Sequence, residues 1–464
     1  MSNIGILGTD IHGRDGVGTR LVIQHQGLTG YGGFALCRTV LHHYGTSEST
    51  DTSILGDGLG IDIGSNTHYA RAFDWRGLEL SKVFKFKNSF EGFQSFVLWV
   101  NDLCCKYNKS KVIAGLEPTG HYWFSLGELL KENNITIAIV NPYHVKQSKE
   151  LDDNLQTKND SKDPKVIAKL VIDGRYSFPY IPEGIYGELR VADKLKNDIT
   201  QQIISIKNKI HRWLSIYFPE YENIYSSIDS KSGFLLLKET PLPKDIVELG
   251  SEGIVERWKQ TKLRAVGLDK AKKLEEAAKK SIGCKNITSS ARFEIKLLIE
   301  DYEYKQNQLN SITEELNKLC EKIPMIKEIA EIKGIGIATA ISFVAEVGDI
   351  RRFKSAKQVQ KYAGLALKEN SSGKHKGLTR ISKRGRKKLR TILFRATIPL
   401  IGFNKEFSSI YNYYIERKDN PLKKKQALTA ICCKMIRIFF TILSKGIKYD
   451  ETKMLHDIKR PVAA

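Results

Sequence analysis

Apolar residues between positions 59 and 172 follow two spacings, and this pattern predicts a mixed α/β domain. Short apolar runs typical of strands lie at 59–63, 69–74, 82–86, 112–116 and 135–140. Residues at helical spacing lie between and after them, at 90–103, 121–132, 142–151 and 163–172. The predicted order therefore begins β-β-β-α-β-α-β-α, with three strands before the first helix.

Two long helical patterns follow, and each carries an apolar seam. The first keeps a 3/4 spacing from Ile199 to Tyr217, and the second does so from Leu309 to Ile323. Such seams pack either inside the chain or against a second chain in a coiled coil, and the spacing leaves both alternatives open. A charged helical insert at about 240–285 separates them. A mainly helical domain is expected from residue 326.

Residues 1–56 show neither spacing. The segment is rich in glycine and contains no lysine, since the first lysine is Lys82. We expect a poorly ordered N-terminal extension, either an appended segment or translated upstream sequence, and we expect it to be dispensable. The predicted organisation is an extension at 1–56, a catalytic domain at 57–180, a helical or coiled-coil region at 181–325, a C-terminal domain at 326–450 and a tail at 451–464.

The charge of the chain points to a polyanionic partner. The 464 residues carry a formal net charge of +22, which favours DNA or RNA over a merely solvated basic surface. The seven cysteines form no Cys-x-x-Cys pair, so neither a zinc site nor a disulfide framework is expected. No signal peptide and no apolar run long enough to span a bilayer were recognised, which predicts a cytoplasmic protein without a membrane partner.

Four carboxylates stand at the ends of separate predicted elements. Asp62 closes the first strand, Glu117 follows the fourth, and Asp160 and Asp163 are spaced i, i+3 where a helix begins. Carboxylates that converge in this way hold divalent cations, Mg²⁺ or Mn²⁺, for in-line displacement at phosphodiesters. The element order is that of a ribonuclease-H-like, or RuvC-like, domain, in which the first strand, the fourth strand and the last helix supply the metal ligands.

Two of these acids also have another interpretation. Asp163 ahead of Pro164 is a suitable helix N-cap. The turn after Asp62 also fits an ATPase of the actin-like class, but such a protein needs a second phosphate loop and an adenosine motif, and we find neither. The four acids together, in order on the expected elements, therefore favour the metal site.

A basic run and a glycine turn predict phosphate contacts in the C-terminal domain. Positions 374–390 hold nine Lys and Arg residues and no acid, a density that neutralises several phosphates. The turn at 332–336 is similar to a helix-hairpin-helix turn, in which backbone N–H groups hold a phosphate, although a plain helix–helix turn is the alternative. The predicted nucleic-acid-binding residues are Lys333, Gly334, Gly336, Lys374, Lys376, Arg380, Lys383, Arg384, Arg386, Lys387, Lys388 and Arg390.

A serine next to the basic run is a candidate nucleophile. Ser371 and Ser372 precede Gly373 in a flexible stretch among cations, which would lower a hydroxyl pKa and stabilise a pentavalent transition state. From chemistry alone, an exposed loop serine is far more often a hydrogen-bonding residue.

The motifs nevertheless match a known family. The chain resembles the insertion-sequence "one-one-zero" family of DEDD transposases, relatives of the Piv-type DNA invertase, over about residues 58–445. Two features depart from the family pattern: Pro164 replaces the usual alanine, and residues 1–56 have no counterpart. The matching stretches are Gly60–Gly64, Leu116–Trp123, Asn141-Pro142, Lys158–Asp163, Ile332–Phe353, Tyr362–Leu365, Ser372-Gly373, Ile381–Gly385 and Leu389-Arg390.

This resemblance implies a RuvC-like domain, a coiled coil, and a C-terminal transposase domain with a nucleophilic serine. It assigns catalysis to Asp62, Glu117, Asp160, Asp163 and Ser372, with Ser371 as the adjacent ambiguity. It also implies a structured non-coding RNA that pairs with donor and target DNA. A homo-oligomer, dimer or tetramer, is expected.

The sequence therefore predicts a transposase that acts by site-specific recombination. Two other hypotheses stay open. One is a RuvC-like junction-resolving nuclease that uses metal-activated water, and the other is a nucleic-acid-binding scaffold without catalysis.

Overall fold

The computed structural model describes residues 57–118, 120–152, 162–261, 263, 267–286, 288–368, 371–372, 375–376 and 379–451. The predicted extension at 1–56 lies outside them, as do residues 452–464 of the predicted tail and Asp160. The chain divides into two compact units, Met1–Phe178 and Pro179–Ala464.

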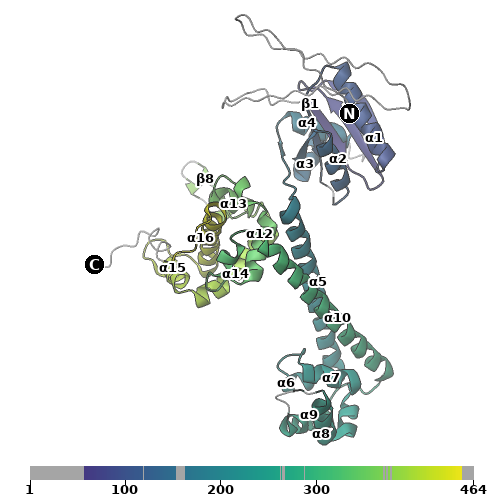
Figure 1. The fold of residues 1–464 in the computed structure, drawn as a ribbon, viewed down its shortest axis with the longest axis vertical. Coiled ribbons are helices and arrows are strands. Elements are labelled where there is room, and N and C mark those ends of the chain that lie inside the picture. The colour runs from purple at the N-terminus through teal and green to yellow at the C-terminus, as the bar shows by residue number, and fades with distance from the viewer. Residues whose placement is uncertain are drawn as a thin grey trace, which may run out of the picture. The chain divides into compact units, whose positions relative to one another are not determined.

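A six-stranded mixed sheet forms the centre of the first unit, in the order β3-β2-β1-β4-β5-β6 (Figure 1). β1 pairs with β4, and β4 with β5, in parallel; the remaining neighbours are antiparallel. The five predicted strands are confirmed, and the two-residue β6 is additional because so short a strand has no detectable spacing. The strands are β1 Asp57–Asp62, β2 Thr67–Phe73, β3 Glu79–Lys87, β4 Val112–Leu116, β5 Thr136–Val140 and β6 Tyr176–Ser177.

Four helices accompany this sheet: α1 Phe90–Lys106, α2 Phe124–Glu132, α3 Pro142–Asp152 and α4 Asp163–Ile172. α2 begins three residues later than predicted, because residues 120–123 form a turn. The N-cap of α4 is Lys162, so Asp163 is its first helical residue and not its cap.

Glycines of β1 allow α4 to lie directly on the sheet. A Cβ at Gly60 would lie 1.9 Å from the backbone oxygen of Pro164, and one at Gly58 would lie 3.0 Å from that of Ala168. Any larger residue would push the helix away. α1 packs on the opposite face, where Leu59 and Phe86 are buried.

Two 34-residue helices dominate the second unit, α5 Gly184–Tyr217 and α10 Thr288–Glu321, and they lie side by side (Figure 1). They run antiparallel: near one end of the pair Trp213 Nε1 donates to Ala291 O at 2.9 Å, and near the other Leu189 shares a core with Leu316. The apolar seams are therefore buried within one chain, as the intrachain alternative predicted. A helical cap packs at the Trp213 end, formed by α6 Tyr221–Ile224, α7 Lys231–Glu239, α8 Pro243–Gln260 and α9 Leu268–Lys279.

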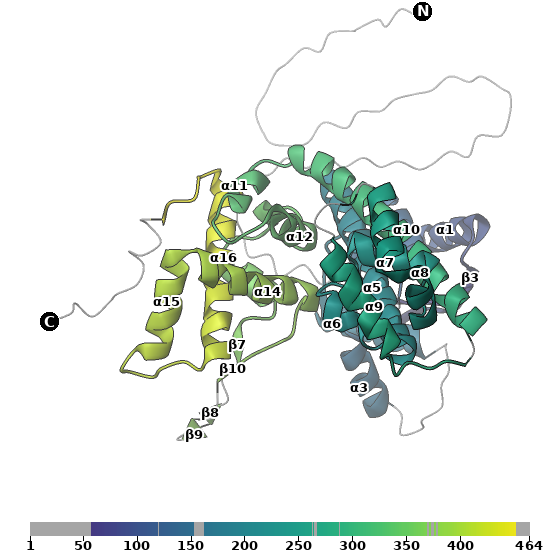
Figure 2. The same cartoon turned by 90° about the horizontal axis from the view of Figure 1, so that it is seen from below.

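The rest of the second unit is a helical bundle with two small hairpins. α14, α15 and α16 contact one another, and Figure 2 shows α15 and α16 running alongside each other with α14 crossing them. β7 pairs with β10, and β8 pairs with β9. The elements are α11 Ile326–Ala330, α12 Ile337–Val347, η1 Ile350–Arg352, α13 Ala356–Tyr362, β7 Leu367–Lys368, β8 Ser371–Ser372, β9 His375–Lys376, β10 Arg380–Ile381, α14 Lys387–Phe403, α15 Lys405–Glu416 and α16 Lys424–Lys445.

Helix α16 contradicts the expectation that no apolar run is long enough to span a bilayer. Among the described residues, α16 alone is long and apolar enough to cross a membrane by length and composition. Its buried residues, including Ile431, Met435 and Phe439, lie in the core shared with α12 and α14. The apolar composition of α16 is therefore explained by core packing.

Candidate functional site

Asp62 and Glu117 occupy neighbouring positions at the ends of two paired parallel strands. β1 pairs with β4 so that Ile61 lies opposite Leu116, and the next residue on each chain is the acid. Neighbouring strands lie about 4.8 Å apart. Since side chains alternate between faces, both acids share the face of Gly60, which is the face covered by α4.

Asp163 reaches the same end of the sheet because α4 runs antiparallel to β1. The contact with the helix moves from Ala168 back to Pro164 as the strand advances from Gly58 to Gly60. Two strand residues and four helical residues both span about 6 Å. Two residues further along β1 is Asp62, which therefore lies beside the N-terminal end of α4. Asp163 is the first residue of that helix.

The electrostatics of Glu117 agree with this placement. Its side chain is partly buried, and burial raises its pKa above the ordinary value. The ammonium of Lys149 lowers this pKa, whereas the charge of Asp163 raises it further. Glu117 and Asp163 are therefore close enough to repel each other.

Lys149, in the last turn of α3, was not predicted as a site residue. Its Nζ lies 2.6 Å from Oδ2 of Asp163. In the sequence it is one of several lysines on a charged helix, and its spacing does not distinguish it from a surface residue.

The donor chemistry fits a hard divalent cation, with one limit. Carboxylate oxygens are the ligands that Mg²⁺ and Mn²⁺ prefer, and the repulsion between Glu117 and Asp163 is what a cation would relieve. Within the described residues, however, no three acidic, His or Cys side chains are arranged to hold a metal. Asp160 is not among those residues.

The predicted basic run divides into inward and outward residues. Lys388 Nζ lies 2.8 Å from Asp193 Oδ2 and 3.2 Å from Glu346 Oε1, and Arg386 Nε lies 2.8 Å from Glu346 Oε2. Asp193 and Glu346 are 0% and 3% exposed. Arg390 donates to Ala363 O at 2.8 Å. Three of the predicted phosphate-binding cations thus make intrachain contacts.

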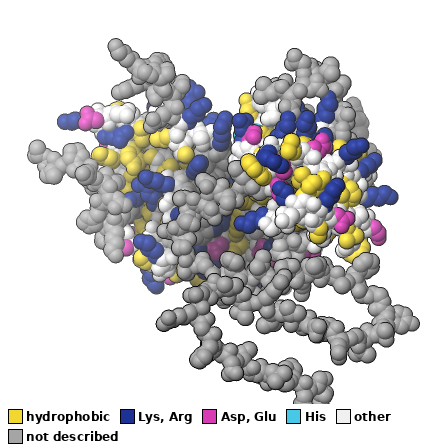
Figure 3. All heavy atoms as spheres, turned by 90° about the horizontal axis from the view of Figure 1, so that it is seen from above, with side chains coloured by type: hydrophobic (Ala, Val, Ile, Leu, Met, Phe, Trp, Pro, Cys, Tyr) yellow, Lys and Arg dark blue, Asp and Glu magenta, His cyan; other side chains and the backbone are white. Residues whose placement is uncertain are grey.

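The other described members of the run face outward. Arg380, Lys383, Arg384 and Lys387 are exposed, and so is Lys333 in the glycine turn. Lys374 lies outside the described residues, and only the backbone of Lys376 is described. Figure 3 shows Lys and Arg side chains spread over one face of the molecule, interleaved with apolar ones.

The two glycines of the predicted turn differ. Gly334 has φ +92°, and a Cβ there would lie 2.7 Å from the Cα of Leu400 in α14, so packing alone requires glycine. Gly336 is exposed and is the N-cap of α12. A plain helix–helix turn therefore accounts for Gly334. At Gly336 the N-terminus of α12 is exposed, as the phosphate-binding alternative requires.

The candidate serine lies in the small hairpin of β8 and β9. Ser372 stands opposite His375, and Ser371 opposite Lys376. Two residues of each strand are paired, so the hairpin is held locally.

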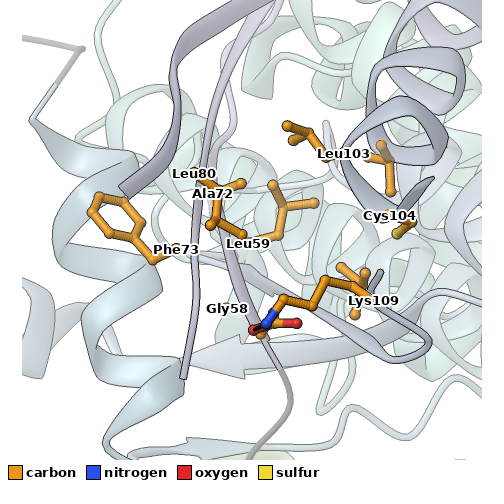
Figure 4. A pocket seen from close by; sticks show the side chains of 11 residues that line it. Gly58, Leu59, Ala72, Phe73, Leu80, Leu103, Cys104 and Lys109 are labelled. Atoms are coloured by element: carbon orange, nitrogen blue, oxygen red, sulfur yellow. Dashed lines mark hydrogen bonds and ion pairs between the residues drawn. The ribbon is translucent and has the colours of Figure 1, made fainter. Parts of the chain in front are cut away.

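A small cavity on the other face of the sheet is not part of the site. It has a volume of about 20 Å³, room for roughly one water, and is lined mainly by apolar side chains of β1, β2, β3 and α1 (Figure 4). Lys109 pairs with Asp57 at its edge, 2.9 Å apart. Burial raises the pKa of the Cys104 thiol in its wall, so this cysteine is a poor nucleophile at neutral pH.

Comparison with known proteins decides the family. A transposase family model of the DEDD type matches residues 59–219, the region of all four predicted acids. A second model, described as transposase IS116/IS110/IS902 family, matches residues 326–412, which include the glycine turn, the serine hairpin and the basic run. The chain belongs to the IS110/IS116 family of transposases.

Relatives match the chain at low identity and over different lengths. The pilin gene-inverting protein of Moraxella bovis is 25% identical over 407 residues, 86% of this chain and 98% of the relative. The transposase for insertion sequence element IS1111A of Coxiella burnetii is 29% identical over 136 residues, 29% of this chain and 37% of the relative. An uncharacterised protein of insertion element IS110 in Streptomyces coelicolor is 22% identical over 300 residues, 64% and 73% of the two chains. As a member of this family, the protein is an enzyme that acts on DNA.

Proposed function

We propose that this transposase moves DNA by site-specific recombination, with a RuvC-like acidic site and a serine nucleophile. One observation carries the proposal: Asp62, Glu117 and Asp163 lie at the same end of the sheet, in a region that matches a DEDD transposase model. The predicted fourth acid, Asp160, precedes Asp163 by three residues.

The acidic site would hold Mg²⁺ or Mn²⁺ through Asp62, Glu117, Asp160 and Asp163. A bound divalent ion supplies Lewis-acid polarisation of a phosphate oxygen. The strands and α4 fix where the carboxylates stand, and the partial burial of Glu117 limits access of water to it.

Ser372 is the proposed nucleophile. Its Oγ loses its proton and attacks phosphorus, the bond from phosphorus to the 3′ oxygen breaks, and that oxygen takes up a proton, which leaves a 5′-phosphoserine. A 3′ hydroxyl of another strand then loses its proton and attacks the same phosphorus, and the serine oxygen leaves and takes up a proton. Exposed cations such as Lys383, Arg384 and Lys387 would hold the flanking phosphates.

A structured RNA and a second copy of the chain complete the proposal. The net charge of +22 favours polyanionic partners. The RNA partner and the dimer or tetramer rest on the family resemblance.

Covalent trapping tests the serine step. A plasmid that carries the element with its genomic flanks is incubated with the protein and Mg²⁺, denatured, and analysed for DNA-linked protein. We expect an adduct with the wild-type protein and with Ser371→Ala, but none with Ser372→Ala. Metal-dependent nicks without any adduct would support the junction-resolving nuclease instead. Binding without nicks would support the scaffold.

A further inference from the structure

The ammonium group of Lys149 is bound to a carboxylate of the proposed metal site. We propose that Lys149 is a built-in counter-cation: it occupies Asp163 when no divalent ion is present and competes with that ion for the carboxylate. This inference rests on the proposed metal site and adds a residue that controls how the site is loaded.

The geometry directs Lys149 toward the acids. Val145, one turn earlier on α3, is 1% exposed and packs in the same cluster as Val166 and Leu170 of α4. Residues four apart share a helix face, so Lys149 projects from the face of α3 that meets α4. Its Nζ then reaches Oδ2 of Asp163 at 2.6 Å.

This ion pair differs from an ordinary surface pair. The Asp163 side chain is 24% exposed and the Lys149 side chain 39%, so the pair is partly shielded from water. The same ammonium also acts on Glu117, so one cation serves two acids that repel each other. Lys146 on the same helix is exposed and makes a natural control.

Competition follows from the chemistry of the oxygen atoms. An Oδ2 that accepts a short bond from an ammonium cannot simultaneously present the same lone pair to a metal. An ion that takes the place of the ammonium on Oδ2 must therefore break the Lys149–Asp163 pair, which weakens apparent metal affinity. Loss of the lysine removes this competitor, but leaves like charges unopposed in the metal-free protein.

The test measures binding of Mn²⁺ alone to the full chain, by electron paramagnetic resonance and by thermal melting after removal of metal. The variants are Lys149→Met, Lys149→Arg, Lys146→Met and Asp163→Asn. We expect Lys149→Met to bind Mn²⁺ roughly three- to tenfold more tightly, the scale of a partly exposed ion pair. Without metal it should also melt at a lower temperature than wild type. Addition of Mn²⁺ should raise its melting temperature more than that of wild type. Lys149→Arg and Lys146→Met should keep wild-type affinity.

Two kinds of failure are distinguishable. If the wild-type protein binds Mn²⁺ in a manner that Asp163→Asn weakens, but Lys149→Met binds no more tightly than Lys146→Met, the counter-cation role is wrong and the metal site stands. If wild type shows no saturable binding that Asp163→Asn weakens, the metal site itself is wrong and the role of Lys149 falls with it. Should Lys149→Met not fold, Lys149→Gln replaces it.

Discussion

His68 of β2 is completely buried between aromatic rings in the unit that carries the acids. Its ring centroid lies 5.1 Å from that of Phe86 and 6.1 Å from that of Phe93. Neither ring nitrogen has a hydrogen-bond partner among the described residues. Burial lowers the pKa of His68, and the amide of Asn88 offsets only part of this effect. The folded chain therefore keeps His68 neutral at a pH where the unfolded chain takes up a proton.

This residue predicts a pH dependence of stability. A histidine whose folded pKa is lowered stabilises fully above its unfolded pKa of about 6.5, and the contribution is lost as pH falls below that value. The free energy of unfolding should drop by up to about 1.4 kcal/mol per pH unit for this group. We expect His68→Phe, which keeps the aromatic packing, to lose less stability than wild type between pH 7.5 and 5.5 in urea melts. Equal losses in both proteins would contradict this account.

At the scale of elements, buried charges join three helices of the second unit. Asp193 of α5 and Glu346 of α12 both pair with Lys388 of α14, and Ser342 Oγ donates to Asp193 Oδ1 at 2.6 Å. Burial opposes the charge of Lys388, but the two acids outweigh it and raise its pKa. Because the pKa is raised, the stabilising contribution is complete at neutral pH and is lost only in strong alkali.

Adjacent lysines on α14 should therefore behave differently. Lys388→Met leaves two buried acids with fewer cations and should lower the free energy of unfolding by about 2 to 3 kcal/mol, below the usual range for a buried pair because this lysine side chain is 37% exposed. Lys387→Met should change stability by less than about 0.5 kcal/mol. It should instead weaken DNA binding at all sequences and reduce the salt slope by about 0.9. Urea melts measure stability, and fluorescence anisotropy at several salt concentrations measures DNA binding. A large loss of stability in Lys387→Met, with weaker DNA binding but normal stability in Lys388→Met, would overturn the division of the basic run.

The spacing of apolar residues predicts helices and strands, but not which elements pack against one another. It predicts β4 with its observed ends, because a fully buried strand is a continuous apolar run. The seam from Ile199 on α5 predicts burial, yet it cannot tell α10 from a second chain. The two residues of β6 have no spacing to detect. Lys149 and Lys388 look like surface lysines in the sequence because their acidic partners, Asp163 and Asp193, are distant along the chain.

At the scale of the whole molecule, the proposed chemistry is shared between two units. The predicted acids belong to Met1–Phe178, whereas Ser372 and the basic run belong to Pro179–Ala464. The ends of strands predict Asp62 and Glu117 as site residues from the sequence, because the strand order places such ends together. Ser372 has no comparable structural signal, since a serine in a short hairpin has many uses. The acids are thus predicted by physical pattern, and the serine by family likeness.

The most direct test of the central claim is metal-dependent strand cleavage by acid-site variants. A plasmid with the element and its flanks is cut by wild type, Asp62→Asn, Glu117→Gln and Glu128→Gln in a Mg²⁺ titration; Glu128, an exposed residue of α2, is the matched control. Asp62→Asn and Glu117→Gln should lower cleavage by at least about a hundredfold, the usual scale for loss of a catalytic electrostatic group, while DNA affinity stays near wild type. Glu128→Gln should cleave normally. Cleavage by Glu117→Gln within a few-fold of wild type at saturating Mg²⁺ would contradict the assignment of this site.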